Sequence, residues 1–313
     1  MAAEPDQGVG APSGGSHPRR GRSLTRDPWN YLFVSPWLIG LVLFTAGPVI
    51  AALVLSFTDY PLLRAPQFVG LANYERLLTA DSKFLDSLTV TLVYVVVSVP
   101  LTLAVALGLA VALNTGFRFL GTYRAIYYLP SLLGGSVAIA VMWRQVFGTD
   151  GLLNQVLRLV GIDATSNWLT NPDTAIWTLI ALHVWQFGSP LVIFLAGLKQ
   201  IPADYYEAAA LDGAGPLRSF WSITLPMLTP VLFFNLVMQT IGAFQAFSPA
   251  YIVSDGTGGP LNATLFYTLY IYQEGFTYFR MGYASALAWM LLLIIAASTA
   301  LLFWSSKKWV HYQ

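Results

Sequence analysis

The sequence predicts an all-α membrane protein with six transmembrane helices. Of its 313 residues, 56% are hydrophobic and only 10% are charged, and the mean hydropathy is +0.61. A soluble domain carries about 25% charged residues, so this chain could not cover a water-facing surface with the charges that it has. Six stretches of at least 19 residues contain no Asp, Glu, Lys or Arg, and a spanning helix needs roughly 20 apolar residues.

The first residues differ in composition from the rest of the chain. Residues 1–28 are rich in Gly, Pro and Ser, carry a late cluster of Arg, and lack the apolar core of a cleavable signal peptide. We expect a flexible cytoplasmic tail over 1–28 and a polytopic membrane domain over 29–313. The six spans are expected at about 31–57, 88–113, 123–147, 174–198, 226–250 and 283–306, with a polar loop at 201–226.

A seventh uncharged stretch, 256–273, needs separate treatment because an odd number of spans would put the two termini on opposite sides. It opens with Gly256-Thr257-Gly258-Gly259-Pro260, which leaves about twelve mainly apolar residues, Leu261 to Tyr272. Twelve residues are too few to cross a bilayer. We therefore expect an external loop followed by an interfacial helix rich in Tyr.

The distribution of Lys and Arg fixes the expected orientation. With the tail inside, ten of the 16 Lys and Arg residues fall in cytoplasmic segments and six in external ones. This asymmetry has the sign that the positive-inside rule requires. Both termini and the polar loop at 201–226 are therefore expected in the cytoplasm.

The polar loop predicts two short helices joined by a tight turn. We expect the first helix over about Ala203 to Leu211. The sequence Asp212-Gly213-Ala214-Gly215 then stops it, since these residues tolerate a left-handed or turn backbone. Pro216 suits the start of the second segment, and Pro226 disturbs that segment as the next apolar run begins.

Ten positions of this loop resemble the EAA loop of ABC-importer permeases, whose pattern runs EAA, DGA, F, I and LP at this spacing. The matching residues are Glu207-Ala208-Ala209, Asp212-Gly213-Ala214, Phe220, Ile223, Leu225 and Pro226. In that family the loop is a cytoplasmic coupling helix, which seats in a groove of the ATP-hydrolysing subunit with its Glu facing a basic residue. The alternative is an ordinary amphipathic connector between two membrane helices.

The resemblance implies the transmembrane-domain fold of a type I ABC importer and an ATPase-coupling role for nine loop residues. These are Ala203, Tyr206, Glu207, Ala208, Ala209, Asp212, Gly213, Ala214 and Phe220. It also implies a second, homologous permease in a heterodimer, two ATP-binding subunits that hold ATP and Mg, and an extracellular or periplasmic sugar-binding protein. The expected setting is the lipid bilayer of a bacterial inner membrane, with no nucleic-acid partner.

Weaker matches outside the loop resemble the sugar-type permeases specifically. They extend the resemblance over nearly the whole chain from about Tyr31. The matching words are Phe68-Val69-Gly70-Leu71, Asn73-Tyr74, Phe84, Ser87-Leu88, Thr91, Leu129-Pro130, Trp143, Phe147, Gly151 and Asn154.

Polar side chains inside the spans are the candidates for contact with a cargo. An unsatisfied polar group in hydrocarbon costs several kcal/mol, so such side chains usually face a cavity or another helix. Amides beside aromatic rings suit a carbohydrate, because rings stack on the apolar face of a pyranose while amides serve its hydroxyls. In sugar permeases that bind cargo within the membrane, the contacts lie on the helices flanking the EAA loop. By loop-relative position the resemblance implies Gln186, Phe187, Ser189, Gln239, Ala243 and Ala246, and residue type adds Trp185 and Gln245.

A structural alternative exists for each of these residues. Gln and Ser in membrane helices often only bridge neighbouring helices. We interpret His183 as a packed or helix-bridging histidine, Pro100 and Pro190 as helix kinks, and Gly134-Gly135 as a site of close helix packing.

The sequence excludes several kinds of chemistry. It has no G-x-x-x-x-G-K-[ST] phosphate loop, so the chain cannot itself be the nucleotide-hydrolysing subunit. It has no cysteine, which excludes disulfides and thiolate metal sites. No catalytic, cofactor-binding or metal-binding residue is predicted in this chain. The six uncharged stretches also lack the buried charges of a proton- or sodium-coupled carrier.

We therefore expect the permease subunit of an ATP-driven importer that moves a carbohydrate by alternating access. An oligosaccharide is the favoured class of carbohydrate. Two alternatives stay open. One is a permease for a polyol or a glycerol-phosphate-type solute, and the other is a secondary carrier that works without an ATPase.

Overall fold

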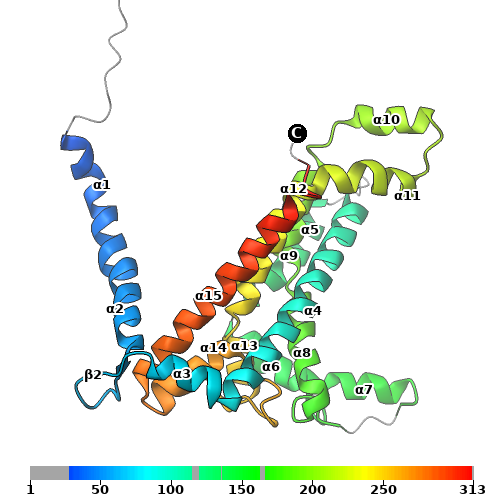
Figure 1. The fold of residues 1–313 in the computed structure, drawn as a ribbon. Helices are drawn as coiled ribbons and strands as arrows, with labels where there is room; N and C mark the ends of the chain where they lie inside the picture. Colours follow the sequence, from blue (N-terminus) through cyan, green and yellow to red (C-terminus); the bar gives the residue numbers. More distant parts are fainter. Residues whose placement is uncertain (1–27, 115–119, 135, 163–165, 312–313) are drawn as a thin grey trace, which may run out of the picture. The chain divides into compact units, whose positions relative to one another are not determined.

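The computed structural model describes residues 28–114, 120–134, 136–162 and 166–311 (Figure 1). The cytoplasmic tail expected over 1–28 lies outside the described residues, apart from its last residue. The chain forms two compact units, residues 1–50 and 51–313. The described residues are predominantly helical, which confirms the predicted all-α class.

The first unit is a helix interrupted by one π turn. Helix α1 covers Pro28–Leu41, the π turn η1 covers Val42–Ala46, and α2, Gly47–Ser56, begins here and continues into the second unit. Pro48 accounts for the π turn, because its nitrogen has no hydrogen to give to the preceding helical turn. The N–H of Gly47 bonds to the carbonyl of Val42 instead.

The second unit holds the other elements. It begins with a short antiparallel ladder of β1 (Thr58–Asp59) and β2 (Gln67–Phe68). Its helices and π turns are α3 (Ala72–Thr79), α4 (Ser82–Leu113), α5 (Leu120–Leu133), α6 (Val137–Phe147), α7 (Leu152–Leu159), α8 (Pro172–Trp185), α9 (Gly188–Leu198), α10 (Ala203–Leu211), α11 (Pro216–Ser219), η2 (Phe220–Thr224), α12 (Leu225–Phe244), α13 (Ser248–Val253), α14 (Tyr267–Tyr272), η3 (Gln273–Thr277) and α15 (Met281–Ser306).

Among the described residues, four helices are long and apolar enough to cross a membrane, and up to six spans result if each of two bent helix pairs counts as one. The four are Leu32–Ser56, Ser82–Leu113, Pro216–Val253 and Met281–Ser306; the pairs are Gly121–Leu133 with Val137–Leu159 and Pro172–Trp185 with Gly188–Leu198. Each of the six expected spans overlaps one of these segments.

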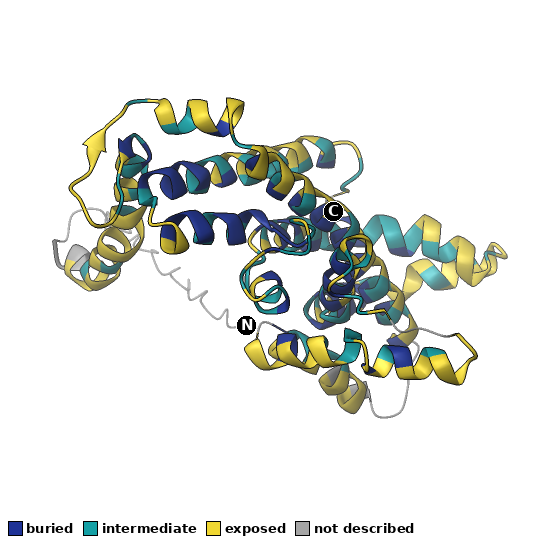
Figure 2. Ribbon diagram, turned by 90° about the horizontal axis from the view of Figure 1, so that it is seen from below, coloured by how far each residue is buried: buried dark blue, intermediate teal, exposed yellow. Residues whose placement is uncertain are grey.

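Helix α4 is the central element of the second unit, and it packs against α8, α9 and α12. Its buried face carries small residues at one-turn spacing, Ser98, Thr102, Ala106 and Ala110, which let neighbouring helices approach closely. The Thr102 hydroxyl is satisfied within the helix, since it donates to the Ser98 carbonyl at 2.8 Å. Figure 2 shows buried residues gathered where helices pack together and exposed residues around the outside.

The break between α8 and α9 has a chemical cause. The two helices bend by 40° at Gln186 and Phe187. Pro190 has no N–H to give to the carbonyl of Gln186, four residues earlier. The hydroxyl of Ser131, on α5, replaces the missing donor at 2.8 Å and accepts from the N–H of Ser189 at 3.0 Å. A side chain on α5 therefore satisfies the broken backbone, as the membrane interior requires.

The close packing expected at Gly134-Gly135 is present at Gly134, whereas Gly135 lies outside the described residues. A Cβ atom at 134 would lie 2.2 Å from Cδ of Gln186, so a larger residue there would force the Gln186 side chain to move. The Gln186 amide donates to the Gly134 carbonyl at 3.3 Å.

One end of the second unit is held by a polar cluster around Asp81, the N-cap of α4. Its carboxylate accepts the N–H of Phe84 at 3.2 Å, the hydroxyl of Tyr270 at 2.5 Å, and the hydroxyl of Tyr283. The guanidinium of Arg76 lies 4.4 Å from the centre of the Tyr283 ring. Burial opposes the charge on Asp81, but these hydrogen bonds and Arg76 outweigh it and lower the pKa of the carboxyl. The cluster joins α3, α4, α14 and α15.

A second buried acid lies next to this cluster. Glu274 is 2% exposed, and Arg280 Nη2 donates to its Oε1 at 3.2 Å. Arg280 Nε lies 3.0 Å from Oε2, close enough for an ion pair but not aligned as a hydrogen bond. Burial raises the pKa of Glu274, although Arg280 and Arg76 act in the opposite direction.

Candidate functional site

Helices α10 and α11 project from one end of the second unit, beside the C-terminus and opposite the end that carries α3, α7 and α14 (Figure 1). Helix α10 covers Ala203–Leu211, which confirms the first helix predicted in the polar loop. Its first turn includes Asp204, whose negative charge interacts favourably with the positive end of the helix dipole.

The turn after α10 is a complete Schellman motif. The N–H of Ala214 bonds to the carbonyl of Ala209 at 2.9 Å, and the N–H of Gly213 bonds to that of Ala210 at 3.1 Å. Gly213 has a φ of +74°, in the left-handed region that favours glycine. The turn chemistry predicted for Asp212 to Ala214 is therefore present, and it fixes the direction in which the chain leaves α10.

The second segment of the loop runs into the membrane helix without a break. Pro216 begins α11, as expected, and the chain passes through the π turn η2 into α12. Pro226 has no N–H for the carbonyl of Ser222, and the N–H of Leu225 bonds to the carbonyl of Phe220 instead. The disturbance predicted at Pro226 thus takes the form of a wider helical turn, so α11, η2 and α12 form one continuous rod.

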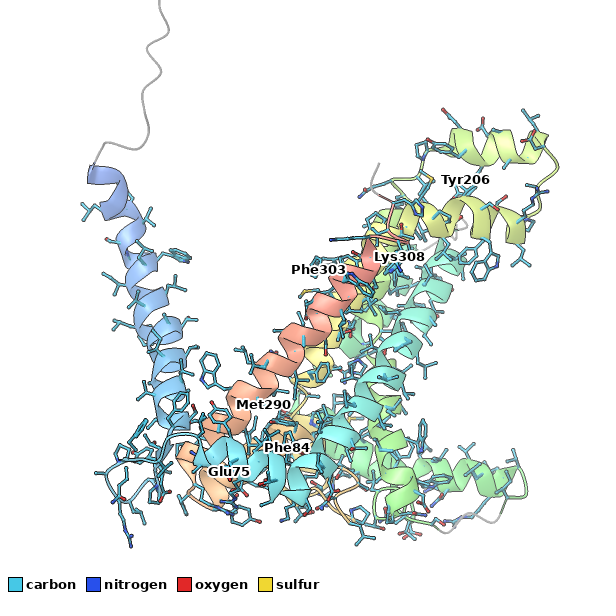
Figure 3. The ribbon with its side chains drawn as sticks, in the orientation of Figure 1. Glu75, Phe84, Tyr206, Met290, Phe303 and Lys308 are labelled. Carbon is cyan, nitrogen blue, oxygen red and sulfur yellow. The ribbon has the colours of Figure 1, made fainter. Side chains whose placement is uncertain are left out.

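The nine expected coupling residues differ in exposure. Ala203, Glu207, Ala208, Asp212 and Gly213 are exposed, whereas Tyr206, Ala209, Ala214 and Phe220 are partly buried. The hydroxyls of Tyr206 and Thr224 are 2.9 Å apart, which ties α10 to the base of α12. Figure 3 shows Tyr206 between α10 and the rod below it.

The carboxylate of Glu207 is exposed and has no ion-pair partner among the described residues. A charge in this position is available to a cation on another protein. Helix α10 therefore presents Glu207 outward while Tyr206 faces the chain's own membrane helix.

Sequence reasoning missed the large apolar side chains of the projection. Tyr205 is 51% exposed, Leu211 90%, Leu217 72% and Trp221 61%. A soluble surface would not gather four such residues on α10, α11 and η2. The sequence did contain a signal for this surface, since these large apolar residues lie within an otherwise polar loop. A cavity of about 210 Å³ lies between α10 and the segment formed by α11 and η2. Its lining includes Ala209, Asp212, Arg218 and Ile223.

The cargo candidates before the loop lie at the break between α8 and α9, and they face different surroundings. Ser189 lines a cavity of about 460 Å³ with Ala125 and Tyr128. Trp185 and Phe187 line another of about 490 Å³, which is almost entirely apolar. Gln186 is turned toward Gly134, as described above.

The cargo candidates after the loop are also spread out. Ala243 is 1% exposed and lies in the core of the chain. Gln245 is exposed at the end of α12, and the carbonyl of Ala246 accepts the hydroxyl of Thr268. Gln239 is partly buried on α12.

No group of three or more His, Cys, Asp or Glu side chains that could hold a metal ion occurs in the described part of the chain. The features that stand out are thus the projecting loop and the broken helices below it.

Comparison with known proteins gives relatives over nearly the full length. The chain is 52% identical to the probable ABC transporter permease protein YesP of Bacillus subtilis (strain 168), with 94% of this chain and 96% of that protein covered. It is 34% identical to the lactose transport system permease protein LacF of Rhizobium radiobacter, with 90% and 95% covered. It is 33% identical to the arabinooligosaccharides transport system permease protein AraP of Bacillus subtilis (strain 168), with 85% and 84% covered.

The fold is also that of a solved transporter. A chain of the bacterial alginate ABC transporter, in complex with its alginate pentasaccharide-bound periplasmic protein, matches with a TM-score of 0.75 at 21% identity, and 90% of this chain and 95% of that one are covered. The family model described as "Binding-protein-dependent transport system inner membrane component" matches residues 77–311. The chain, a multi-pass membrane protein, therefore belongs to the family of inner membrane components of binding-protein-dependent transport systems.

Proposed function

We propose that this chain is the permease subunit of an ATP-driven importer for a carbohydrate, best an oligosaccharide. The observation that carries the proposal is the projecting loop, in which the ten-position EAA pattern coincides with an exposed helix ending in a fixed turn. The names of the lactose and arabinooligosaccharide permeases support carbohydrate as the class of cargo.

The proposal includes partners. A second, homologous permease would complete the translocation pathway, two ATP-binding subunits would hold ATP and Mg, and an external binding protein would deliver the cargo. The loop and both termini would lie in the cytoplasm. The exposed carboxylate of Glu207 and the apolar side chains of Leu211, Leu217 and Trp221 suit a groove that is apolar with a basic residue at one side.

The geometry supports a mechanical route for coupling. Because α11, η2 and α12 are continuous, a displacement of the projection would move the inner end of α12 directly. The Tyr206–Thr224 contact would make α10 move with this rod. ATP binding to the partner subunits would thus favour one arrangement of the spans over the other, through differential contacts with the loop.

Glycerol phosphate is the second candidate cargo, because the chain is 34% identical to the sn-glycerol-3-phosphate transport system permease protein UgpA of Agrobacterium fabrum (strain C58 / ATCC 33970). A phosphate group favours cationic partners. The six uncharged stretches provide none, which favours a neutral carbohydrate. Family membership disfavours a carrier that works without an ATPase.

The test is uptake into proteoliposomes that contain this chain with its partner permease, the ATPase subunits and the binding protein. Glu207→Lys should leave the complex inserted but lower ATP-dependent uptake at least about tenfold, because it reverses a charge at the contact. Asp204→Lys is the matched control, since Asp204 is exposed on the same helix outside the EAA pattern. Uptake near the wild-type rate with Glu207→Lys would contradict the coupling role. Comparing neutral oligosaccharides with glycerol phosphate in the same assay decides the cargo class.

A further inference from the structure

A cavity of about 500 Å³ lies in the second unit, among elements at the end opposite the projecting loop. Figure 1 shows α6 and α13, which border it, at that end. Its walls come from three segments that are far apart in the sequence: the C-terminal end of α6, residues 167–170 before α8, and the loop after α13. Under the proposed function this end faces the outside of the cell, so a ligand would enter the cavity from external water.

The loop after α13 has a fixed conformation. The hydroxyl of Ser254 accepts the N–H of Gly258 at 2.9 Å, and the amide of Gln273 donates to the Gly256 carbonyl at 2.8 Å. Gln273 is 6% exposed, so this hydrogen bond anchors the loop to a buried side chain. Asp255 has a φ of +50°, which is uncommon for a residue with a side chain and indicates a conformation imposed by its surroundings.

The wall formed by α6 and residues 167–170 is also held by a buried amide. Asn154, on α7, is 0% exposed. Its NH2 group donates to the carbonyls of Thr149 and Ser166, both at 2.9 Å, and its oxygen accepts the indole N–H of Trp168 at 2.7 Å. These bonds tie the end of α6 to the segment before α8. The walls of the cavity are therefore shaped by the chain itself, which lowers the cost of ordering them around a ligand.

An ion pair links the two walls. The guanidinium of Arg144 donates to both carboxylate oxygens of Asp255, at 2.7 and 3.0 Å, and so joins α6 to the loop after α13. The two side chains are 41% and 71% exposed, so the cavity reaches the surface at this pair. They are the only charged residues among the described ones that line the cavity, and their charges cancel. The cavity therefore favours a neutral polar ligand over an ion.

The remaining polar groups of the lining suit hydroxyl groups. The amide of Gln145 is exposed and has no hydrogen-bond partner among the described residues. Asn167 uses its side-chain oxygen for the N–H of Leu169 at 3.0 Å, and its NH2 group has no partner in the part of the chain that the structure describes. A carbohydrate hydroxyl both donates and accepts, so it matches these amides, while Leu169 and Pro260 offer apolar contact. The volume of about 500 Å³ lies within the range of small-molecule sites.

We propose that this cavity is a carbohydrate-binding site that holds part of the cargo at the outer end of the chain. The inference rests on the proposed function, since that function places the cavity outside and makes a carbohydrate the cargo. Gln145 and Asn167 supply the amide contacts, and the Arg144–Asp255 pair keeps the two walls together. The site is separate from the cargo candidates on α8, α9 and α12, because none of those residues lines it. Cargo thus meets this chain before it enters the spans.

A thiol-labelling experiment tests the site, because the chain has no cysteine of its own. Thr170→Cys places one thiol in the cavity, and Thr79→Cys places one on exposed α3 surface outside it. The complete complex is reconstituted in nanodiscs with partner subunits that lack accessible cysteines, and labelling by a hydrophilic maleimide is followed without ATP and without the binding protein.

The probe is a panel of neutral di- to tetrasaccharides that includes lactose and arabinooligosaccharides. At least one of them should slow the labelling of Thr170→Cys about fivefold at a concentration of about four times its dissociation constant, because an occupied cavity excludes the maleimide. The labelling rate of Thr79→Cys should stay unchanged.

A second substitution tests whether the lining itself binds the sugar. In the Thr170→Cys background, Gln145→Leu should raise the sugar concentration for half-maximal protection about fivefold to tenfold, the value of one hydrogen bond. Gln155→Leu is the matched control, since Gln155 is exposed on α7, donates to the Asp150 carbonyl at 2.9 Å, and lies outside the cavity. It should leave this concentration unchanged.

Three results would overturn the inference: labelling of Thr170→Cys that no sugar of the panel slows, equal slowing in Thr79→Cys, or equal effects of Gln145→Leu and Gln155→Leu. Slowing by the sugar-free binding protein but by no sugar would make the cavity a docking surface for that protein instead. Should Thr170→Cys fail to insert, Gln145→Cys places the thiol on the α6 side of the cavity and carries the same expectation. Because labelling needs no ATP, absence of ATP-dependent uptake of every sugar by the wild-type complex would contradict the proposed function separately.

Discussion

The two ends of the 51–313 unit are stabilised in different ways. At one end the Asp81 carboxylate accepts three hydrogen bonds and joins four helices through buried tyrosines. At the other end the Tyr206–Thr224 contact ties α10 to the membrane helix, while large apolar side chains and the Glu207 carboxylate are exposed. Figure 3 labels Phe84 near the first end and Tyr206 at the second. The polar groups of the Asp81 cluster are satisfied within the chain, whereas Glu207 has no ion-pair partner among the described residues.

The largest expected effect concerns the turn of the projection. Gly213→Pro should abolish ATP-dependent uptake, because Pro is restricted to a φ of about −65° and has no N–H for the Schellman hydrogen bond. The wild-type φ is +74°. The melting temperature of the complex should change little, since the turn is exposed.

Gly215→Pro provides a matched control in the same turn, because Gly215 already has a φ of −72°. It should retain most of the uptake activity. Wild-type uptake with Gly213→Pro would mean that the direction of the chain after α10 is irrelevant to coupling, and the contrast between the two ends would lose its functional meaning.

The next effect is on stability at the opposite end. Asp81→Ala should lower the free energy of unfolding by about 3 kcal/mol, because buried tyrosine hydroxyls lose their acceptor. Thermal unfolding of the purified complex in detergent measures it. Asp86→Ala is the control, since exposed Asp86 accepts one hydrogen bond, from Asn262 at 3.0 Å.

The pH dependence of this stabilisation has a definite sign. The folded protein lowers the pKa of Asp81 below its ordinary value of 3.8. The stabilisation by the ionised carboxylate is therefore fully present above about pH 4 and is lost as the pH falls through the lower folded value. The stability difference between wild type and Asp81→Asn should accordingly stay constant from neutral pH to about pH 4 and shrink only below it. A difference that shrinks already between pH 7 and 5 would contradict the assignment.

The smallest effect concerns the contact between the Tyr206 and Thr224 hydroxyls, which joins α10 to the base of α12. Tyr206→Phe removes the contact with the Thr224 hydroxyl and should weaken the docking of α10 by about 1 kcal/mol. Amide hydrogen exchange in residues 201–226 should become several-fold faster, while exchange in α4 stays unchanged. Thr224→Val should give the same result, and the double variant should be no faster than either single one.

The sequence predicted the parts of the site that follow local rules. The bounds of α10 and the turn at Gly213 depend on neighbouring residues alone, and both are present as expected. The π turns η1 and η2 follow from Pro48 and Pro226, but sequence patterns do not distinguish a wider turn from a kink. The β1–β2 ladder has only two residues per strand, so no alternating pattern in the sequence predicts it. It is held by Asn73, whose amide donates to the Ser56 and Thr58 carbonyls.

Contacts between distant segments lay beyond sequence reasoning. The edge-on contact of His183 with the Tyr94 ring depends on how α4 and α8 pack, which no local pattern encodes. For the same reason the cargo candidates could be chosen by residue type and loop-relative position, but not sorted into those that line a cavity, such as Ser189, and those in the core, such as Ala243. Their contact with cargo remains a prediction.

The Ser131 hydroxyl restricts which residues this position can accept. Its single proton is donated to the Gln186 carbonyl and one of its two lone pairs accepts the Ser189 N–H, so the group must be both donor and acceptor at one point. Alanine would leave the Gln186 carbonyl and the Ser189 N–H without this hydrogen-bond partner in the bilayer interior, whereas threonine offers the same hydroxyl. Natural variants of this permease should therefore interchange serine and threonine here, and a change to an apolar residue should occur only together with loss of the proline at 190.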